Sequence, residues 1–323
     1  MADREEKTRR NDTGKKSKGG KRNKIVAIEM IILILLIMAA AVIFIQKDKS
    51  VKEAARIHDQ KTKKTEQTTP ATQKDNEIEE ETEGTDEETG DRDEAVPDRS
   101  NFAVQPGVSV GTTEQSDEKI VYLTLDDGPS DNTQAVLDIL DKYNAKATFF
   151  VTGEMPEYKD MIKAAYDKGH TIGMHTYSHD YAKVYASVDA YFQDLDQIGQ
   201  MVQEEIGYVP CFIRFPGGSS NTVSKKYTAG IMSTLVQEVQ NRGYQYYDWN
   251  GSSGDGSVRT TEELVAQATS FDSNNIILLC HDSHGKQTTV EALPQIIEHY
   301  QSLGYTFKAL DRDSFVAHHG VNN

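Results

Sequence analysis

Residues Ile120–Pro129 read IVYLTLDDGP, an apolar, β-favouring run that ends in two adjacent acids and a Gly-Pro turn. The run predicts a buried strand that stops at Asp126 and Asp127. Two neighbouring carboxylates repel, and one of them would stay protonated unless a cation gives them separate roles. An Asx-type turn is the alternative explanation. The pair therefore suggests one metal ligand and one general base at the end of a strand.

The region from Lys119 to Leu310 alternates strand-like runs with stretches of helical period. This alternation predicts an α/β fold, a parallel sheet covered by helices. With about seven strands we expect a (β/α) barrel, closed or incomplete; an open doubly wound sheet is the alternative. The expected strands are 120–125, 147–151, 171–174, 211–215, 244–247, 276–280 and 305–310. The expected helices are 133–143, 156–168, 188–206, 224–242, 261–270 and 290–303.

Reactive side chains follow several of these strands, and ligands of parallel α/β folds bind at the carboxyl ends of the strands. Asp127 follows the first strand, and His175 and His179 follow the third in an H-x3-H spacing. A carboxylate and two imidazoles leave positions open for water and substrate, as catalytic metal sites do. Two unrelated polar residues in a loop are the alternative. We expect Zn²⁺ as the cofactor, although Co²⁺ or Ni²⁺ also suits these ligands.

Proton transfer needs a separate set of residues. Asp126 lies beside the expected metal ligand and can act as the general base. His281, after the sixth expected strand, is the candidate general acid, and Asp248 is expected to orient its imidazole and raise its pKa. Arg214 is expected to hold Asp126 through a charge-assisted hydrogen bond.

Substrate contacts are expected from four further residues. Gly217 and Gly218 leave backbone N–H groups uncovered, which suits an oxyanion hole, although a plain turn would look the same. Trp249, the single tryptophan of the chain, and Leu279 could form an apolar wall for an acetyl methyl group. Core packing is the alternative for both side chains.

Several other histidines and both cysteines have no role in this scheme. We expect His170 and His299 at helix ends or on the surface, and residues 318–319 in a frayed tail. Cys211 and Cys280 are expected to be buried free thiols, because the sequence does not show that they are close enough for a disulfide.

The N-terminal third of the chain differs in composition from the rest. Residues 1–24 carry ten Lys or Arg against four acids, and residues 25–45 are apolar apart from Glu29. This pattern predicts a basic cytoplasmic tail and a transmembrane anchor, with the remainder outside the cell. A cleaved signal peptide and a buried core helix are the alternatives. Residues 46–116 lack a sustained apolar period and become strongly acidic, so we expect a disordered linker.

The net charge of the chain bears on which class of macromolecule it can bind. The whole chain has a formal net charge of −16. Nucleic-acid backbones are bound by Lys and Arg, so an acidic chain argues against such a partner. An acidic surface is compatible with a carbohydrate partner.

Five motifs between about Lys119 and Leu310 resemble the polysaccharide deacetylase family, also called the NodB-homology domain or carbohydrate esterase family 4. The distorted (β/α) barrel of this family agrees with the expected strands. The matching stretches are TLDDGP (Thr124–Pro129, family T-F-D-D-G-P), HTYSH (His175–His179, family H-[ST]-x-x-H), RFPG (Arg214–Gly217, family R-x-P-Y), DW (Asp248–Trp249) and LCH (Leu279–His281, family L-x-H).

The resemblance assigns roles to these residues. It implies that Asp126 is the general base and that His281 is the general acid, whose pKa is tuned by Asp248. It also implies that the metal ligands are Asp127, His175 and His179, with Thr176 bracing the loop of the two histidines. Leu279 is implied to line an acetyl pocket. The third motif departs from the family, because Gly217 stands where the family has Tyr. The family Tyr contributes its backbone N–H to the oxyanion, which Gly217 could also do. The missing ring changes the wall of the substrate groove.

Together these features lead us to expect a metal-dependent hydrolase that removes acetyl groups from an N-acetylated amino-sugar polymer. The catalytic domain is expected at residues 117–318, as a monomer tethered to the membrane. The outward topology favours peptidoglycan, with N-acetylglucosamine as the sugar. An O-deacetylase of acetylated wall or xylan-like glycans is one alternative. A catalytically silent wall-binding module on the same fold is the other.

Overall fold

The computed structural model describes residues 99–323. The expected cytoplasmic tail at 1–24, the membrane segment at 25–45 and the linker up to residue 98 lie outside this range. Within residues 99–323, no helix combines the length and the apolar character that a membrane crossing requires.

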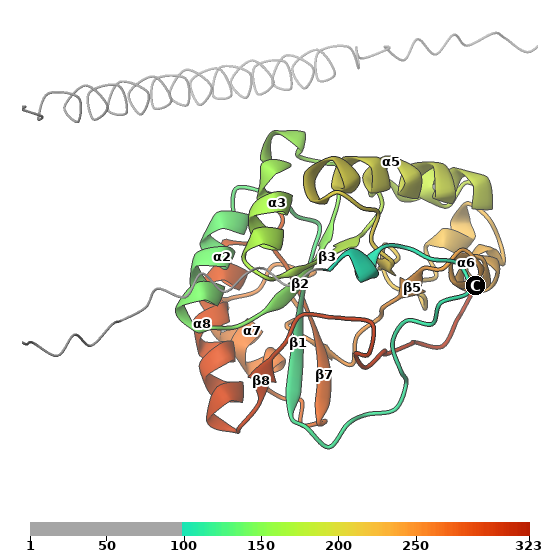
Figure 1. Ribbon diagram of the computed structural model, residues 1–323. Coiled ribbons are helices and arrows are strands. Elements are labelled where there is room, and N and C mark those ends of the chain that lie inside the picture. Colours follow the sequence, from blue (N-terminus) through green and yellow to red (C-terminus); the bar gives the residue numbers. More distant parts are fainter. Residues whose placement is uncertain (1–98) are drawn as a thin grey trace, which may run out of the picture. The chain divides into compact units, whose positions relative to one another are not determined.

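A single sheet with every strand pair parallel forms the centre of the domain (Figure 1). Its path runs β5-β4-β3-β2-β1-β7-β6, and β8 pairs with β1 outside that path. The edge strands β5 and β6 do not pair with each other within the described residues, so the barrel is incomplete. The strands are β1 (Ile120–Asp126), β2 (Ala147–Val151), β3 (Thr171–Met174), β4 (Phe212–Ile213), β5 (Gln245–Tyr246), β6 (Gly251–Ser252), β7 (Asn275–His281) and β8 (Thr306–Phe307).

Strand β6 was not expected from the sequence. Its two residues, Gly251 and Ser252, are small and carry no apolar strand signal. They are held by pairing with Leu278 and Leu279 of β7. Tertiary pairing therefore creates a strand where local propensity gives none.

The central strand β1 is buried on both faces, as is typical of parallel sheets. Val121, Leu123 and Leu125 belong to the core between the sheet and the outer helices. Ile120 and Tyr122 belong to a second core on the opposite face. This division follows from the alternation of side chains along a strand.

Helices cover the sheet, and α2, α3 and α8 lie side by side along one part of it (Figure 1). Helix α5 begins and ends as expected: Ser187 caps its first turn by accepting from the Ala190 N–H at 3.0 Å, and Gly207 ends it with φ = 89°. The helices are α2 (Thr133–Lys142), α3 (Asp160–Asp167), α4 (Tyr181–Val184), α5 (Val188–Ile206), α6 (Ile231–Asn241), α7 (Thr261–Ala268) and α8 (Gln287–Ser302), with 3-10 turns η1 (Ser100–Phe102), η2 (Pro156–Tyr158) and η3 (Ser224–Lys226).

Two of the expected helices are divided. The stretch 224–242 splits into η3 and α6, because Gly230 between them takes the left-handed conformation with φ = 78°. The stretch 156–168 splits into η2 and α3. The short helix α4 was not expected from the sequence; Asp180 starts it by accepting from the Ala182 N–H at 2.9 Å.

The expected linker does not extend to residue 116. Residues 99–116 pack on the domain: Phe102 is buried edge-on against Phe212 at 5.2 Å between ring centroids. The buried guanidinium of Arg99 donates to the backbone carbonyls of Tyr166 and His170. Single apolar and basic residues anchor this segment, and such a pattern is too sparse to show as a sequence period. The domain therefore includes residues before 117.

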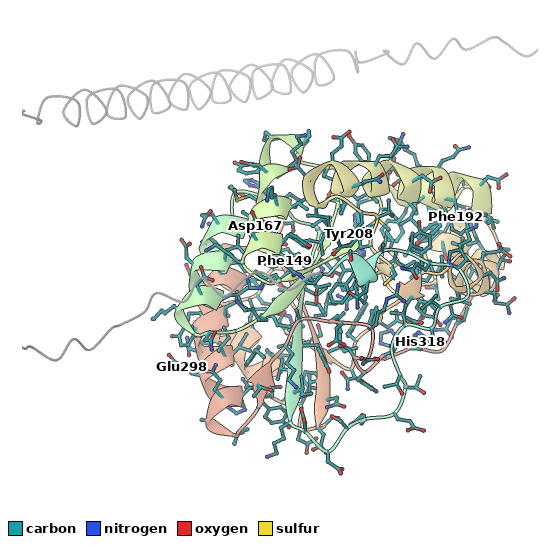
Figure 2. The ribbon with its side chains drawn as sticks, viewed as in Figure 1. Phe149, Asp167, Phe192, Tyr208, Glu298 and His318 are labelled. Carbon is teal, nitrogen blue, oxygen red and sulfur yellow. The ribbon has the colours of Figure 1, made fainter. Side chains whose placement is uncertain are left out.

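The expected frayed tail is also ordered, and the domain continues past residue 318. His318, which is labelled in Figure 2, stacks on Tyr246 with 3.9 Å between ring centroids. The backbone carbonyl of Asn323 accepts from the N–H of Ser233 at 2.8 Å, at the start of α6. The last residues of the chain thus pack on β5 and α6.

His170 lies at a helix end, as one of the two expectations had it: its N–H donates to the Ala165 carbonyl of α3 at 3.1 Å. It is not on the surface, and the expectation for the cysteines is confirmed. His170 is completely buried, and its Nδ1 accepts the N–H of Ala147 at 3.2 Å. Cys211 and Cys280 are buried free thiols.

Candidate functional site

The expected site residues do meet at the carboxyl edge of the sheet. Asp126 ends β1 and His281 ends β7, and the two are direct neighbours in the register of these strands. His175 follows β3, and Arg214 follows β4. Parallel strands in register therefore bring together residues that are up to 155 positions apart, from Asp126 to His281.

Asp127, His175 and His179 form a cluster that could hold a metal ion. One ligand atom from each lies within 4.8 Å of the other two. The Nε2 atoms of His175 and His179 each lie 3.4 Å from Oδ1 of Asp127. That Oδ1 is buried and has no hydrogen-bond partner among the described residues, which is the environment expected of an atom reserved for a cation.

The protonation states of the cluster suit metal binding. Burial acts to raise the pKa of Asp127, but the nearby His175, His179 and His281 outweigh it and hold the pKa below its ordinary value. Burial lowers the pKa of His175, favouring neutral imidazole. The Nδ1 of His175 donates to the carbonyl of Arg214 at 2.8 Å, leaving the Nε2 lone pair toward Asp127. Ionised carboxylate and neutral imidazole are the metal-binding forms.

The backbone around the cluster is strained. Asp127, Thr176 and His179 adopt left-handed φ angles of 68°, 71° and 46°. Such conformations cost on the order of 1–3 kcal/mol each and gather at functional sites. They persist only when the surrounding structure holds them in place.

Asp194 on α5 holds the H-x3-H loop, a role that the resemblance gave to Thr176. Its Oδ1 accepts from the backbone N–H groups of Tyr177 at 2.6 Å and Ser178 at 2.9 Å, and its Oδ2 accepts from the Ser178 hydroxyl at 2.6 Å. The Thr176 hydroxyl is buried without a partner among the described residues. A signal existed: Asp194 is a carboxylate on the apolar face of α5, beside Leu195.

Arg214 makes the expected bond to Asp126. Its Nη1 donates to Oδ1 of Asp126 at 2.7 Å and to the Thr124 hydroxyl at 2.8 Å. Its Nε donates to the Tyr247 carbonyl at 2.8 Å. The guanidinium is fully buried, and Asp126 is 2% exposed. Oδ1 of Asp126 is thus fixed, while its Oδ2 accepts no hydrogen bond from another described residue.

The expected partner of His281 is wrong. Asp248 lies elsewhere: its carboxylate accepts from the backbone N–H of Ser219 at 2.8 Å and of His319 at 2.8 Å. Asp255 instead occupies the position that was expected for Asp248, because Oδ1 of Asp255 accepts from Nδ1 of His281 at 2.8 Å. Asp255 follows the short strand β6, and that unexpected strand is the reason its position could not be foreseen.

Asp255 is itself held firmly and controls the charge of His281. Its Oδ2 accepts from the His281 backbone N–H at 2.7 Å and from the Thr289 hydroxyl at 2.8 Å. Burial acts to lower the pKa of His281, but the hydrogen bond and charge of Asp255 outweigh it and raise the pKa to about 9. The imidazolium can therefore donate a proton from Nε2, which faces the cluster 3.9 Å from Oδ2 of Asp127.

Comparisons with known proteins identify the family. Residues 113–236 match the family model described as polysaccharide deacetylase. The crystal structure of the catalytic domain of peptidoglycan N-acetylglucosamine deacetylase from Eubacterium rectale is 45% identical in sequence, with a TM-score of 0.63. The similarity covers 67% of this chain and 98% of that one. The chain belongs to the polysaccharide deacetylase family.

A curated relative and a solved structure from Bacillus cereus are also similar to this chain. A peptidoglycan-N-acetylglucosamine deacetylase is 29% identical over 226 residues, which is 65% of this chain and 78% of the relative. The crystal structure of the polysaccharide deacetylase Bc1974 shares 30% identity and a TM-score of 0.53, covering 64% of this chain and 97% of that one.

The third motif of this polysaccharide deacetylase departs from the family pattern at Gly217, whose φ is 75°. The Gly217 N–H donates no hydrogen bond to another described residue, so it is free for a ligand. The Gly218 N–H is not free, because it donates to the Phe215 carbonyl at 2.8 Å. Only one of the two expected oxyanion donors is therefore open.

The two expected wall residues lie at the same edge of the sheet. Trp249 packs against His319 with 4.8 Å between ring centroids, and the guanidinium of Arg214 lies 5.7 Å from its ring. Leu279 is 7% exposed on β7. Both positions are compatible with lining a pocket next to the cluster.

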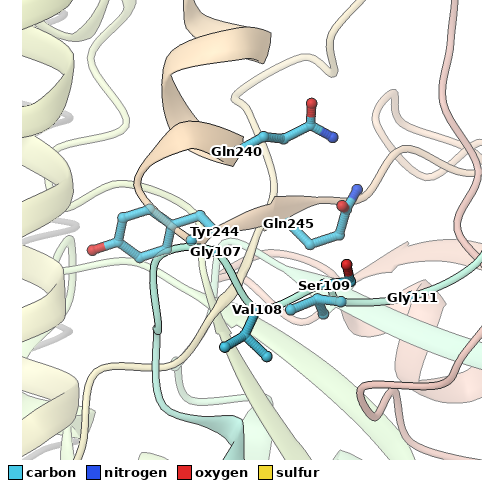
Figure 3. Close-up of a pocket in the computed structure, with 9 residues that line it drawn as sticks. Gly107, Val108, Ser109, Gly111, Gln240, Tyr244 and Gln245 are labelled. Atoms are coloured by element: carbon cyan, nitrogen blue, oxygen red, sulfur yellow. The ribbon is translucent and has the colours of Figure 1, made fainter.

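A separate cavity of about 390 Å³ lies at the amino end of β5, between residues 107–111 and α6 (Figure 3). Gln240, Tyr244 and Gln245 line it. The candidate site lies at the carboxyl ends of the strands, so this cavity is not part of it.

Proposed function

We propose that this polysaccharide deacetylase is a metal-dependent N-deacetylase of peptidoglycan, with N-acetylglucosamine as the sugar. The Asp127–His175–His179 cluster supports the proposal most directly, together with Asp126 and His281, which both lie within 4 Å of it. The similarity to the catalytic domain from Eubacterium rectale, whose own description names peptidoglycan N-acetylglucosamine, supports the substrate.

Asp127, His175 and His179 would hold the cation. Zn²⁺ is our first choice, and Co²⁺ or Ni²⁺ also suits two imidazoles and a carboxylate. Such a cation supplies Lewis acidity and lowers the pKa of a water molecule. The chain supplies three possible ligands, and the Arg214 carbonyl fixes the tautomer of His175.

The other residues move protons and stabilise charge. Oδ2 of Asp126 accepts a proton from the attacking water, while Arg214 keeps Oδ1 fixed. The Gly217 N–H donates to the acetamide oxygen as negative charge develops there. His281 donates its Nε2 proton to the leaving nitrogen. The carbon–nitrogen bond breaks, and the products are acetate and a free amino sugar.

The test uses the purified full chain and a panel of N-acetylated and O-acetylated glycans that includes peptidoglycan fragments. We expect acetate release from N-acetylated wall fragments, with mass detection placing the loss on the amino sugar. A chelator should abolish release, and added Zn²⁺, Co²⁺ or Ni²⁺ should restore it. Loss only from O-acetyl groups would indicate an O-deacetylase. Glycan binding without acetate release would indicate a silent binding module.

We also propose that residues 25–45 anchor the chain in the membrane with the domain outside the cell. The basic flank at 1–24 and the apolar run after it support this orientation. Protease added to intact cells should remove the domain and spare the N-terminal tail. Protection of the domain would contradict the topology.

A further inference from the structure

Tyr181 links the two loops that border the cluster. It is the first residue of α4, directly after the H-x3-H loop. Its ring stands edge-on to His179, with 5.7 Å between centroids and an interplanar angle of 89°. Its hydroxyl lies over Gly217: a Cβ built there would be 2.7 Å from Oη of Tyr181. The phenol therefore occupies the space in which a side chain at 217 would begin.

The Tyr181 hydroxyl has no hydrogen-bond partner among the described residues, and its ring is half-buried. The neighbouring Tyr185 differs, because it is fully buried and donates to the Pro216 carbonyl at 2.8 Å. The two rings contact each other at 5.5 Å between centroids. Tyr185 thus packs against Tyr181 from the interior and has its hydroxyl occupied, whereas Tyr181 is partly exposed and its hydroxyl remains an unused donor.

The geometry leaves hydrogen bonding as the role of the Tyr181 hydroxyl. In the proposed reaction Asp126 and His281 already provide for both proton transfers. A phenol hydroxyl that lies over Gly217, beside His179, can donate a hydrogen bond to a polar substrate.

We propose that Tyr181 is a substrate-binding residue whose hydroxyl donates a hydrogen bond to the bound amino sugar and whose ring supplies the groove wall that Gly217 lacks. The ring comes here from the first residue of α4, which follows the H-x3-H loop, whereas the family pattern places a tyrosine in the third motif. This inference rests on the proposed function for the identity of the sugar.

Tyr181→Phe in the full chain tests the hydrogen bond, because it keeps the ring against His179. With an N-acetylglucosamine tetramer we expect KM to rise about 5- to 10-fold, the effect of one lost hydrogen bond, with a smaller change in kcat. Bound metal should stay constant. Tyr143→Phe is the control: Tyr143 follows α2 at the opposite end of the strands and donates to Glu298. It should leave KM unchanged.

An unchanged KM in Tyr181→Phe would overturn the inference. A loss of bound metal, or a fall confined to kcat, would also overturn it, because the hydroxyl would then serve the loop or the reacting atoms. A second comparison tests the contact itself. Gly217→Ala should impair KM more in the unaltered chain than in the Tyr181→Phe background, where the atom nearest the new Cβ is gone; equal effects would contradict the geometry.

The two proposals can fail separately. If the unaltered chain releases no acetate from any N-acetylated glycan, the proposed function fails. Tyr181 is then judged by the equilibrium affinity for the same tetramer. Equal affinities of Tyr181→Phe and the unaltered chain would overturn the binding role.

Discussion

Oδ1 of Asp255 accepts the Nδ1 hydrogen bond of His281 at 2.8 Å, and this pair sets the protonation of the expected general acid. The two residues are 26 positions apart and meet because β6 pairs with β7. Asp248, which belongs to a recognisable motif, is occupied by Ser219 and His319 instead.

Asp255→Asn should move the alkaline limb of the pH–rate profile of kcat/KM to lower pH. His281 acts as an acid only while protonated, and Asp255 is what raises its pKa to about 9. Without that hydrogen bond and negative charge the pKa of His281 falls, although Asp126 and Asp127 still act to raise it. Activity should therefore be lost at lower pH, by ~1 pH unit or more. Asp248→Asn is the matched control and should leave the limb in place. An equal shift of the alkaline limb in both variants would indicate that Asp248 also controls the pKa of His281.

Asp126→Asn and Asp127→Asn should fail in different ways. The first removes the expected base, so acetate release should fall about 10²- to 10⁴-fold while bound metal is retained. The second removes an expected metal ligand and should lower the affinity of the protein for the metal. Acetate assays and elemental analysis of the dialysed proteins separate the two outcomes. Unchanged acetate release by Asp126→Asn would disprove the base assignment.

Asp194→Asn should weaken metal binding although Asp194 is not a ligand. Its Oδ1 accepts from two backbone N–H groups of the H-x3-H loop, and its Oδ2 accepts from the Ser178 hydroxyl. Asparagine keeps one acceptor oxygen but loses the negative charge and the second acceptor. Residues behind metal ligands typically contribute 10- to 100-fold in affinity, so we expect a loss of about that size in chelator competition. Asp196→Asn, on the exposed face of α5, is the control. Equal metal affinities of the Asp194→Asn and Asp196→Asn variants would show that the H-x3-H loop keeps its conformation without the Asp194 carboxylate.

His170 should make the domain less stable in mild acid. Burial, followed by the positive charge of Lys146, lowers the pKa of His170 to about 3, against 6.5 for an exposed histidine. Below pH 6.5 the unfolded chain takes up a proton that the folded chain does not, so stability is present above that pH and is lost as pH falls toward 3. The loss should reach about 2 kcal/mol between pH 7 and pH 5.

Chemical denaturation of the unaltered chain and of His170→Asn at pH 7 and pH 5 measures this loss of folding stability. The variant should show a smaller loss on acidification, because asparagine does not titrate. His299→Asn, which changes a partly exposed histidine on α8, should keep the full loss. Parallel curves for all three proteins would show that His170 does not control acid stability.

The parallel α/β fold, most helix and strand positions, and the grouping of Asp127, His175 and His179 could be predicted from the sequence. Long apolar runs such as Ala147–Val151 need no partner to be recognised, and β2 has those bounds. Asp127, His175 and His179 could be grouped because carboxyl ends of parallel strands share one edge. Asp126 and Arg214 were paired for the same reason.

The residues that support that site could be identified only from the folded chain. Asp255 reaches His281 through a two-residue strand, and Asp194 reaches the loop from a helix, so neither contact leaves a local pattern. The packing of residues 99–116 and of the tail after 318 likewise depends on single side chains such as Phe102 and His318. Periodicity reports the face a residue occupies, whereas a hydrogen bond between distant segments depends on where folding brings them.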